Sequence, residues 1–552
     1  MALTEIRETG STVEAEGPSL ARVLRGYGPL VAFAVLFALM AAFLPSTLRS
    51  AEDIARTEQE QPVDPSTGLP SDGATKGTAG EKGTKGKTRQ IGGGVTVPVL
   101  KGSCPDRKQQ IPGDPYSPPC IAFSGSNGGG TTRGVSAKEI VVSARILDEK
   151  GFQQTLAALA GAEITDEPPD IKRTISAFAE YFNQRFQFYG RKIRIAYYNG
   201  KGSGTTELLG GGQAEAQADA INVAQNIKAF AELNGASAPF ADALARQKVV
   251  SFGTPYLSRK WHLDHRPYNW SIATDCSIVA ETAGEYYVNL LAGKKAKYAG
   301  GDLKDKTRVL AGLSPENPWY AECHDDFEKV IRDGGFNPQV RVNYRLDLNS
   351  MSNQAANVIA QLKSKGATSV FCGCDPIFPV FLTTKASEQN YFPEWVLVGV
   401  ALTDHDIVGQ LMDQEQWAHT SGVSFAGSIL PQRAGIGYQA YKSFREDEPA
   451  FAVEIIYAQM YMLALGIQLA GPNLTPESFE SGMRTYPGGT GLYGTWAFPQ
   501  GAYTPTRDTR ILWWDPDRIS IYNRKKGAYV EAYGGKRFGL GRLPKGEPDI
   551  FK

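Results

Sequence analysis

The sequence lacks an excess of charge of either sign. Lys and Arg together number 58, and so do Asp and Glu, which gives a formal net charge of zero over 552 residues. Nucleic-acid-binding domains carry a basic excess on one face, and none of their sequence signatures occurs in this chain. We therefore expect no nucleic-acid partner.

Histidine is scarce and catalytic motifs are missing. The chain has five histidines, and three of them lie in two clusters, 262–265 and 404–406, that lack a helical His-Glu-x-x-His or a third ligand at metal-binding spacing. No nucleophile elbow, paired-carboxylate frame or dinucleotide fingerprint stands in its required context. We expect neither a metal nor a cofactor, and the protein is predicted not to be an enzyme.

A long hydrophobic run without charge lies near the N-terminus. Residues 26–48 carry no charge, and Arg22 and Arg25 precede them. Basic residues on that side predict a cytoplasmic N-terminus, with the rest of the chain outside. The uncharged length favours a retained transmembrane anchor, while the short apolar centre, 30–44, leaves a cleaved signal sequence and secretion open.

The two segments that follow, 49–94 and 95–134, have few residues that could form a hydrophobic core. Residues 49–94 are rich in Gly, Thr, Lys, Pro and Glu, which predicts a disordered linker. In the following extension, 95–134, Cys104 and Cys120 enclose a proline-rich loop. A disulfide between these two cysteines would replace the missing core, and a zinc site is the weaker alternative because other ligands are absent nearby.

The central stretch, 229–255, has the sequence AFAELNGASAPFADALARQKVVSFGTP. Residues 229–233 and 249–252 are short apolar runs, as expected of parallel strands that helices cover on both faces. Each run ends in a turn of small residues. Ligands of open α/β sheets bind at the carboxyl ends of the strands, so these two turns are the first candidates for a binding site.

The same alternation continues on both sides. Runs at 140–147 and 192–198 predict strands, and apolar residues at helical spacing predict a helix over 171–188. Beyond a crossing at 268–274, further strand patterns alternate with helix patterns up to residue 425. The strand patterns are 308–313, 340–346, 368–374, 395–400 and 420–425. A long apolar helix, 452–469, then precedes a Gly-rich turn and aromatic strands.

This order of elements resembles the type I periplasmic binding protein superfamily, in its branch of substrate-binding proteins for branched-chain amino acids, over roughly residues 135–539. The resemblance implies an α/β fold with two doubly wound lobes of mostly parallel strands, joined by a hinge. The expected domains are a cytoplasmic N-terminus (1–25), the anchor or signal (26–48), the linker (49–94), the extension (95–134), lobe 1 (135–274), lobe 2 (275–425), the return to lobe 1 with closing strands (426–539) and a loose tail (540–552).

The resemblance also implies where a ligand is held. In the family, turns of the first lobe grip the ligand and side chains of the second lobe then enclose it. The corresponding first-lobe residues are Ala236, Ser237, Gly253 and Thr254. The second-lobe residues are Asp275, Trp319, Tyr320, Asp375 and Ala401.

One position departs from the family. Amino-acid receptors commonly place an acidic residue after the fourth strand of lobe 2, to pair with the ligand's ammonium, where this chain has Ala401. An unpaired ammonium in a closed cleft is costly, so an ordinary branched-chain amino acid is in doubt. Asp375 or Asp404 could substitute, or the ligand is an amide, an acid or an apolar compound.

Four cysteines map to the second lobe. Cys276 with Cys323 is the preferred pairing among the alternatives. Cys372 and Cys374 lie on one face of a strand, where a metal or redox site is the competing interpretation, but an exported location favours disulfide bridges.

The predicted function is that of an extracytoplasmic solute-binding protein that closes on a small ligand and delivers it to an ABC-type importer. Its partners would be that ligand, a membrane permease, and the membrane itself through the N-terminal helix. The alternative is a membrane-anchored sensory or interaction ectodomain on the same clamp.

Overall fold

The computed structural model describes residues 108–147, 166–254, 256–375, 377–399, 402–427 and 430–552. It also gives the backbone of a two-stranded antiparallel ladder, Thr88–Gln90 (β1) with Thr96–Pro98 (β2). The predicted membrane helix and Cys104 lie outside the described residues, and so does the predicted linker apart from β1.

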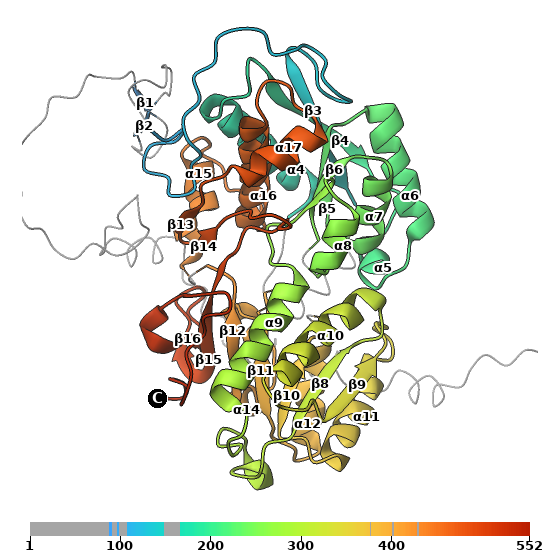
Figure 1. Ribbon diagram of the computed structural model, residues 1–552, viewed down its shortest axis with the longest axis vertical. Helices are drawn as coiled ribbons and strands as arrows, with labels where there is room; N and C mark the ends of the chain where they lie inside the picture. The colour runs from blue at the N-terminus through green and yellow to red at the C-terminus, as the bar shows by residue number, and fades with distance from the viewer. Residues whose placement is uncertain are drawn as a thin grey trace, which may run out of the picture. The chain divides into compact units, whose positions relative to one another are not determined.

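The first lobe is built on a five-stranded parallel sheet with the order β4-β3-β5-β6-β7 (Figure 1). Its strands are β3 (Glu139–Ile146), β4 (Lys192–Asn199), β5 (Ala231–Gly235), β6 (Val250–Gly253) and β7 (Asn269–Trp270). Its helices are α4 (Pro168–Arg185), α5 (Gly204–Leu208), α6 (Gln213–Ile221), α7 (Ala238–Arg246) and α8 (Arg259–Asp264). The apolar residues of β5, β6 and β7 are buried, because helices cover both faces of a parallel sheet.

The second lobe repeats this plan. Its parallel strands are β8 (Leu310–Pro315), β9 (Val340–Tyr344), β10 (Ser369–Cys372), β11 (Glu394–Leu397) and β12 (Thr420–Ser424), in the order β9-β8-β10-β11-β12. Its helices are α9 (Cys276–Tyr286), α10 (Pro318–Asp333), α11 (Met351–Ser364), α12 (Phe378–Glu388), α13 (Asp406–Gly409) and α14 (Gln414–Trp417). The order of strands is the doubly wound one in both lobes, so the predicted fold class is confirmed.

The last part of the chain contributes to both lobes. Helices α15 (Ile436–Lys442), α16 (Val453–Ala470) and α17 (Pro476–Arg484) pack into the core of lobe 1. After a small ladder of β13 (Gly489–Gly491) and β14 (Gly494–Trp496), the long strand β15 (Asp508–Ile519) joins the second sheet antiparallel to β12. Strands β16 (Lys526–Glu531) and β17 (Phe538–Gly539) pair with β15.

Helix α16 is the central helix of lobe 1. In the part of the chain that the structure describes, it is the one helix long and apolar enough to cross a membrane, and 72% of its apolar window is buried inside the protein. Three aromatic rings from α4 and the ring of its C-cap residue, Phe186, pack against Tyr457 and Tyr461 of this helix. These contacts identify α16 as a core helix.

The C-terminal residues 540–552 differ from the loose tail that we expected. Leu543 and Ile550 are buried in the core of lobe 2. The backbone N–H of Leu543 donates to Glu285 over 2.9 Å, and the Asp549 carboxylate accepts from Tyr533 N–H over 2.9 Å. The Gly, Pro and Lys content suggested disorder, whereas the buried apolar side chains and these hydrogen bonds hold the segment on lobe 2.

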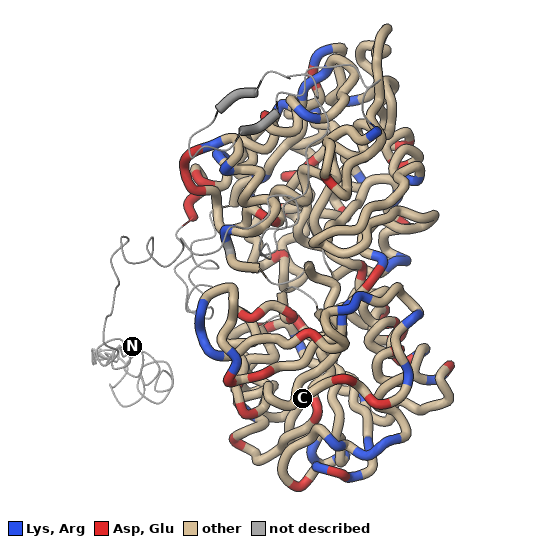
Figure 2. The backbone as a smooth tube through the Cα atoms, turned by 90° about the vertical axis from the view of Figure 1, so that its left-hand side faces the viewer, with Lys and Arg blue, Asp and Glu red and all other residues tan. Residues whose placement is uncertain are grey.

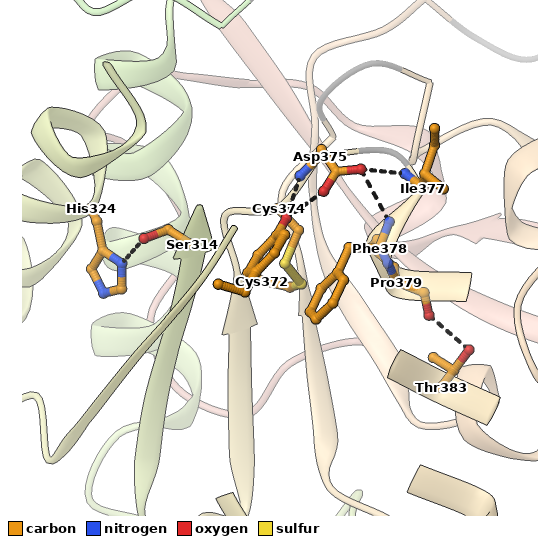
Figure 3. Close-up of a disulfide and its surroundings, with 10 residues drawn as sticks. Ser314, His324, Cys372, Cys374, Asp375, Ile377, Phe378, Pro379 and Thr383 are labelled. Carbon is orange, nitrogen blue, oxygen red and sulfur yellow. Dashed lines mark hydrogen bonds between the residues drawn. A yellow bond between two sulfur atoms is a disulfide. The ribbon is translucent and has the colours of Figure 1, made fainter. Parts of the chain in front are cut away.

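The cysteines of lobe 2 form two disulfides, Cys276–Cys323 and Cys372–Cys374. The first links α9 to α10, as the preferred pairing predicted, and the second closes a turn at the end of β10 (Figure 3). Cys120 is also disulfide-bonded.

Along both lobes basic and acidic residues are interspersed, in keeping with the zero net charge (Figure 2).

The two disulfides of lobe 2 should differ in their contribution to stability. Cys276 and Cys323 are 47 positions apart, so replacing both by serine should lower the free energy of unfolding by about 4 kcal/mol through lost loop-closure entropy. Cys372 and Cys374 are 2 positions apart, and the matched double serine variant should lose less than about half of that. Urea unfolding of both variants measures the difference, and equal losses would contradict it.

Buried histidines predict a loss of stability in acid. Burial lowers the pKa of His262 to about 4, below its ordinary value of 6.5. Since the unfolded chain binds this proton and the folded chain resists it, the free energy of unfolding should fall by about 3 kcal/mol as pH drops from 6.5 to 4. His324, whose pKa burial also lowers to about 4, acts in the same direction.

The test is denaturant unfolding at pH 7, 5.5 and 4 for the wild type and for His262→Leu. The variant starts less stable because packing changes, but its stability should depend less steeply on pH in this range. A pH dependence as steep as that of the wild type would show that His262 is not a source of the acid sensitivity.

Candidate functional site

The first-lobe turn expected to hold a ligand is already occupied by the protein itself. Ser237 is the N-cap of α7, where its hydroxyl oxygen accepts from the N–H of Phe240 over 3.3 Å, and the same hydroxyl donates to the Glu207 carboxylate. Glu207, from the short helix α5, forms a bidentate ion pair with Arg145 at 2.7 and 2.8 Å. Asp219 approaches the same guanidinium at 3.3 Å. All four side chains are buried.

The other first-lobe residues lie at the ends of β5 and β6. The Thr254 hydroxyl donates to the carbonyl of Gly235 over 3.3 Å, which ties the two turns together. Gly253 has a φ of +133°, a conformation that favours glycine, and Ala236 is exposed. The hydroxyl groups of Ser237 and Thr254 therefore form hydrogen bonds within lobe 1.

Two aspartates of the second-lobe set accept hydrogen bonds from backbone N–H groups at the starts of the helices that follow them. Asp275 caps α9 by accepting from Ile278 N–H over 2.9 Å, and Asp375 accepts from the N–H groups of Ile377 and Phe378 over 2.8 and 3.1 Å. Asp375 also accepts from the Tyr344 hydroxyl over 2.5 Å, beside the Cys372–Cys374 disulfide (Figure 3). Burial raises the pKa of both carboxyl groups.

The two aromatic residues of that set close the gap between the lobes at this end. Tyr320, on α10, stacks on Tyr256 of lobe 1 with ring centroids 5.7 Å apart and planes 6° apart. Trp319 packs against the same cluster, together with Leu208 and Trp261. Aromatic side chains thus fill the space beside Ser237. Ala401 lies outside the described residues.

A cavity of about 440 Å³ lies farther toward the segments that connect the lobes. Lobe 1 contributes Gly253 from β6 and Ala458 and Gln459 from α16, while lobe 2 contributes Leu402 and Phe425. The three connecting segments line it as well, through Ile272, Ala273, Thr274, Ala426, Gly427, Leu430, Pro431 and Thr506. Among the described residues of its wall, Gly253 is the one that the sequence predicted as a ligand contact, and the other predicted ligand contacts stay predictions.

The polar side chains of the cavity are acidic or neutral. Asp404 accepts from the Ser424 hydroxyl over 2.7 Å, and Glu454 accepts from the N–H groups of Gly437 and Tyr438 and from the Tyr493 hydroxyl. His405, whose pKa burial lowers, lies edge-on to Tyr522 with ring centroids 4.6 Å apart. Gln459 makes no side-chain hydrogen bond to the described residues, which leaves its amide available to a ligand.

Sequence reasoning missed the side of the cavity that α16 forms. Glu454 and Gln459 lie in a helix that is otherwise almost wholly apolar, and an isolated polar residue in such a helix is a usable signal. That signal is ambiguous, because Gln468 in the same helix is a buried structural residue that bonds to Gln110 and Gln187. Among the residues described, no three His, Cys, Asp or Glu side chains are grouped as metal ligands.

A protein-family model described as "Periplasmic binding protein" matches residues 168–518. No curated protein matches the chain. Among solved structures, the leucine-, isoleucine-, valine-, threonine- and alanine-binding protein from Brucella ovis, in its closed conformation, is 11% identical with a TM-score of 0.51. That match covers 75% of this chain and 97% of the other.

An ABC-transporter solute-binding protein from R. palustris, solved with 4-hydroxybenzoate, is 12% identical with a TM-score of 0.50 and covers 71% of this chain and 97% of the other. At such identities the two structures support the fold alone. The family model carries the assignment and confirms the resemblance seen in the sequence. Because it spans more than half of the sequence, this chain belongs to the periplasmic binding protein family.

Proposed function

We propose that this protein binds a small solute in the cavity between its lobes and presents it to an ABC-type importer. The observation that carries the proposal is the cavity of about 440 Å³, lined by both lobes and by the segments that connect them. This volume is in the range of small-molecule sites. A solute that contacts both lobes favours the closed form over the open one, which is the signal a permease can recognise.

Membership of the family implies an extracytoplasmic location for the folded part of the chain. The disulfides of lobe 2 agree with an oxidising compartment. We propose further that residues 26–48 are retained as a membrane anchor, which would keep the binding protein beside its permease. The zero net charge of the chain gives no electrostatic reason for a nucleic-acid partner.

The cavity can be blocked without disturbing the core. Ile455 lines it and is 44% exposed, so Ile455→Trp should fill the cavity and abolish solute binding while the fold remains. Ile221→Trp is the matched control, since Ile221 is also an exposed helical isoleucine but lies away from the cavity. The measurement is thermal unfolding of the full-length chain in nanodiscs with leucine, 2-naphthoate or 2-naphthamide.

A bound probe at a hundred times its Kd should stabilise the wild type and the control by about 2.7 kcal/mol, and should leave Ile455→Trp unchanged. Stabilisation that persists in Ile455→Trp would place the site elsewhere. If none of the three probes stabilises the wild type, the proposal that this cavity binds small solutes fails.

A further inference from the structure

We propose that the cavity selects a largely apolar solute that carries no carboxylate group, and that it rejects amino acids and free carboxylic acids. This inference rests on the proposed function and names the class of solute for the same site. It departs from the 4-hydroxybenzoate in one solved structure described above and from the amino acids in the name of the other, all of which carry a carboxylate.

The walls of the cavity are mainly apolar. Its larger apolar side chains include Ile272, Val279, Phe425, Leu430, Ile436 and Leu492. Leu402 and Ile455, which also line it, are 50% and 44% exposed, so apolar surface continues to the solvent-accessible side of the cavity. Exposed apolar residues that join an apolar cavity indicate a binding surface for apolar groups.

The charges of the cavity oppose an anion. Its wall contains the carboxylates Asp404 and Glu454, and no Lys or Arg belongs to the described residues that form it. A solute carboxylate would lose its hydration in an apolar space without a cation to pair with, and two like charges would face it. The same desolvation cost applies to the carboxylate of a zwitterionic amino acid, irrespective of which group of the protein its ammonium contacts.

A buried arginine behind this wall, Arg510, is already paired. Arg510 donates to the carbonyl of Gly427 over 2.6 Å and to the Ser424 hydroxyl over 3.3 Å, and it forms an ion pair with Glu531. Because its charge is compensated by Glu531, it offers little to a carboxylate in the cavity. Asp404, which shares Ser424 with Arg510, is positioned on the cavity side instead.

The turn that could otherwise hold a carboxylate is filled from within. The Ser237 hydroxyl donates to Glu207, and the Glu207 carboxylate accepts from both terminal nitrogens of Arg145. A solute carboxylate would have to displace a fully buried ion pair to reach these donors. Glu207 therefore acts as an internal carboxylate at this turn and excludes a second one by occupancy and by charge.

Neutral polar groups remain available in the cavity. The Gln459 amide can donate to an amide or hydroxyl oxygen, and the Asp404 carboxylate can accept from an N–H or O–H of the solute. A small number of polar groups on an apolar wall is enough to fix the orientation of a mainly apolar molecule. An apolar amide or alcohol meets both conditions.

The test compares two probes of nearly the same shape, 2-naphthamide and 2-naphthoate, by calorimetric titration of the full-length chain in nanodiscs. We expect the amide to bind at least about tenfold more tightly, since the carboxylate stays unpaired. Gln459→Arg adds a cation to the cavity wall and should reverse this preference. Gln184→Arg, which adds the same charge to an exposed position on α4, should leave the preference unchanged.

The outcomes separate this inference from the proposed function. Tighter binding of 2-naphthoate or leucine to the wild type, when Ile455→Trp abolishes it, would keep the cavity as the solute site and overturn the proposed solute class. A preference for the amide that Gln459→Arg does not change would also overturn it, because the charge of the wall would not decide selection. If neither naphthyl probe nor leucine binds, the inference fails together with the proposed function.

Discussion

Both sheets consist largely of parallel strands, and a parallel sheet must be covered by helices on both faces. This constraint removes the faces of the sheets as places for a ligand and leaves the ends of the strands. The helices that follow the strands begin there, and polar side chains at these ends cap the first turns of the helices. Ser237 and Asp275 each satisfy the first turn of a helix, so a polar residue in such a turn is committed locally before any solute arrives.

The two ends of the gap between the lobes have opposite character for this reason. Beside Ser237, the ion pair of Arg145 with Glu207 engages the polar groups, and the rings of Tyr256 and Tyr320 stack between the lobes. A buried ion pair recovers its desolvation cost only with good geometry, which the bidentate contact supplies. Toward the connecting segments, small residues such as Gly253 and Ala458 leave a cavity open.

The fold could be predicted from the sequence because it rests on local patterns. The apolar run at 229–233 and the turn after it appear in the structure as β5 and the N-cap of α7. The site could not be predicted in the same way. A serine in a small-residue turn has the same local sequence whether it caps a helix or binds a ligand, and the acid that engages Ser237 comes from α5, 30 positions away. Gln459 is placed by the packing of α16 in lobe 1.

The position of the cavity also decides how binding can be linked to closure. Thr274, Gly427 and Thr506 come from three separate segments that connect the lobes, and all three line the cavity. A solute in this position contacts the connections themselves as well as Gly253 of lobe 1 and Leu402 of lobe 2. Any change in the angle between the lobes alters these contacts together, so the affinity of the two forms for the solute must differ. That difference in affinity, and nothing else about the solute, sets how far binding shifts the protein toward closure.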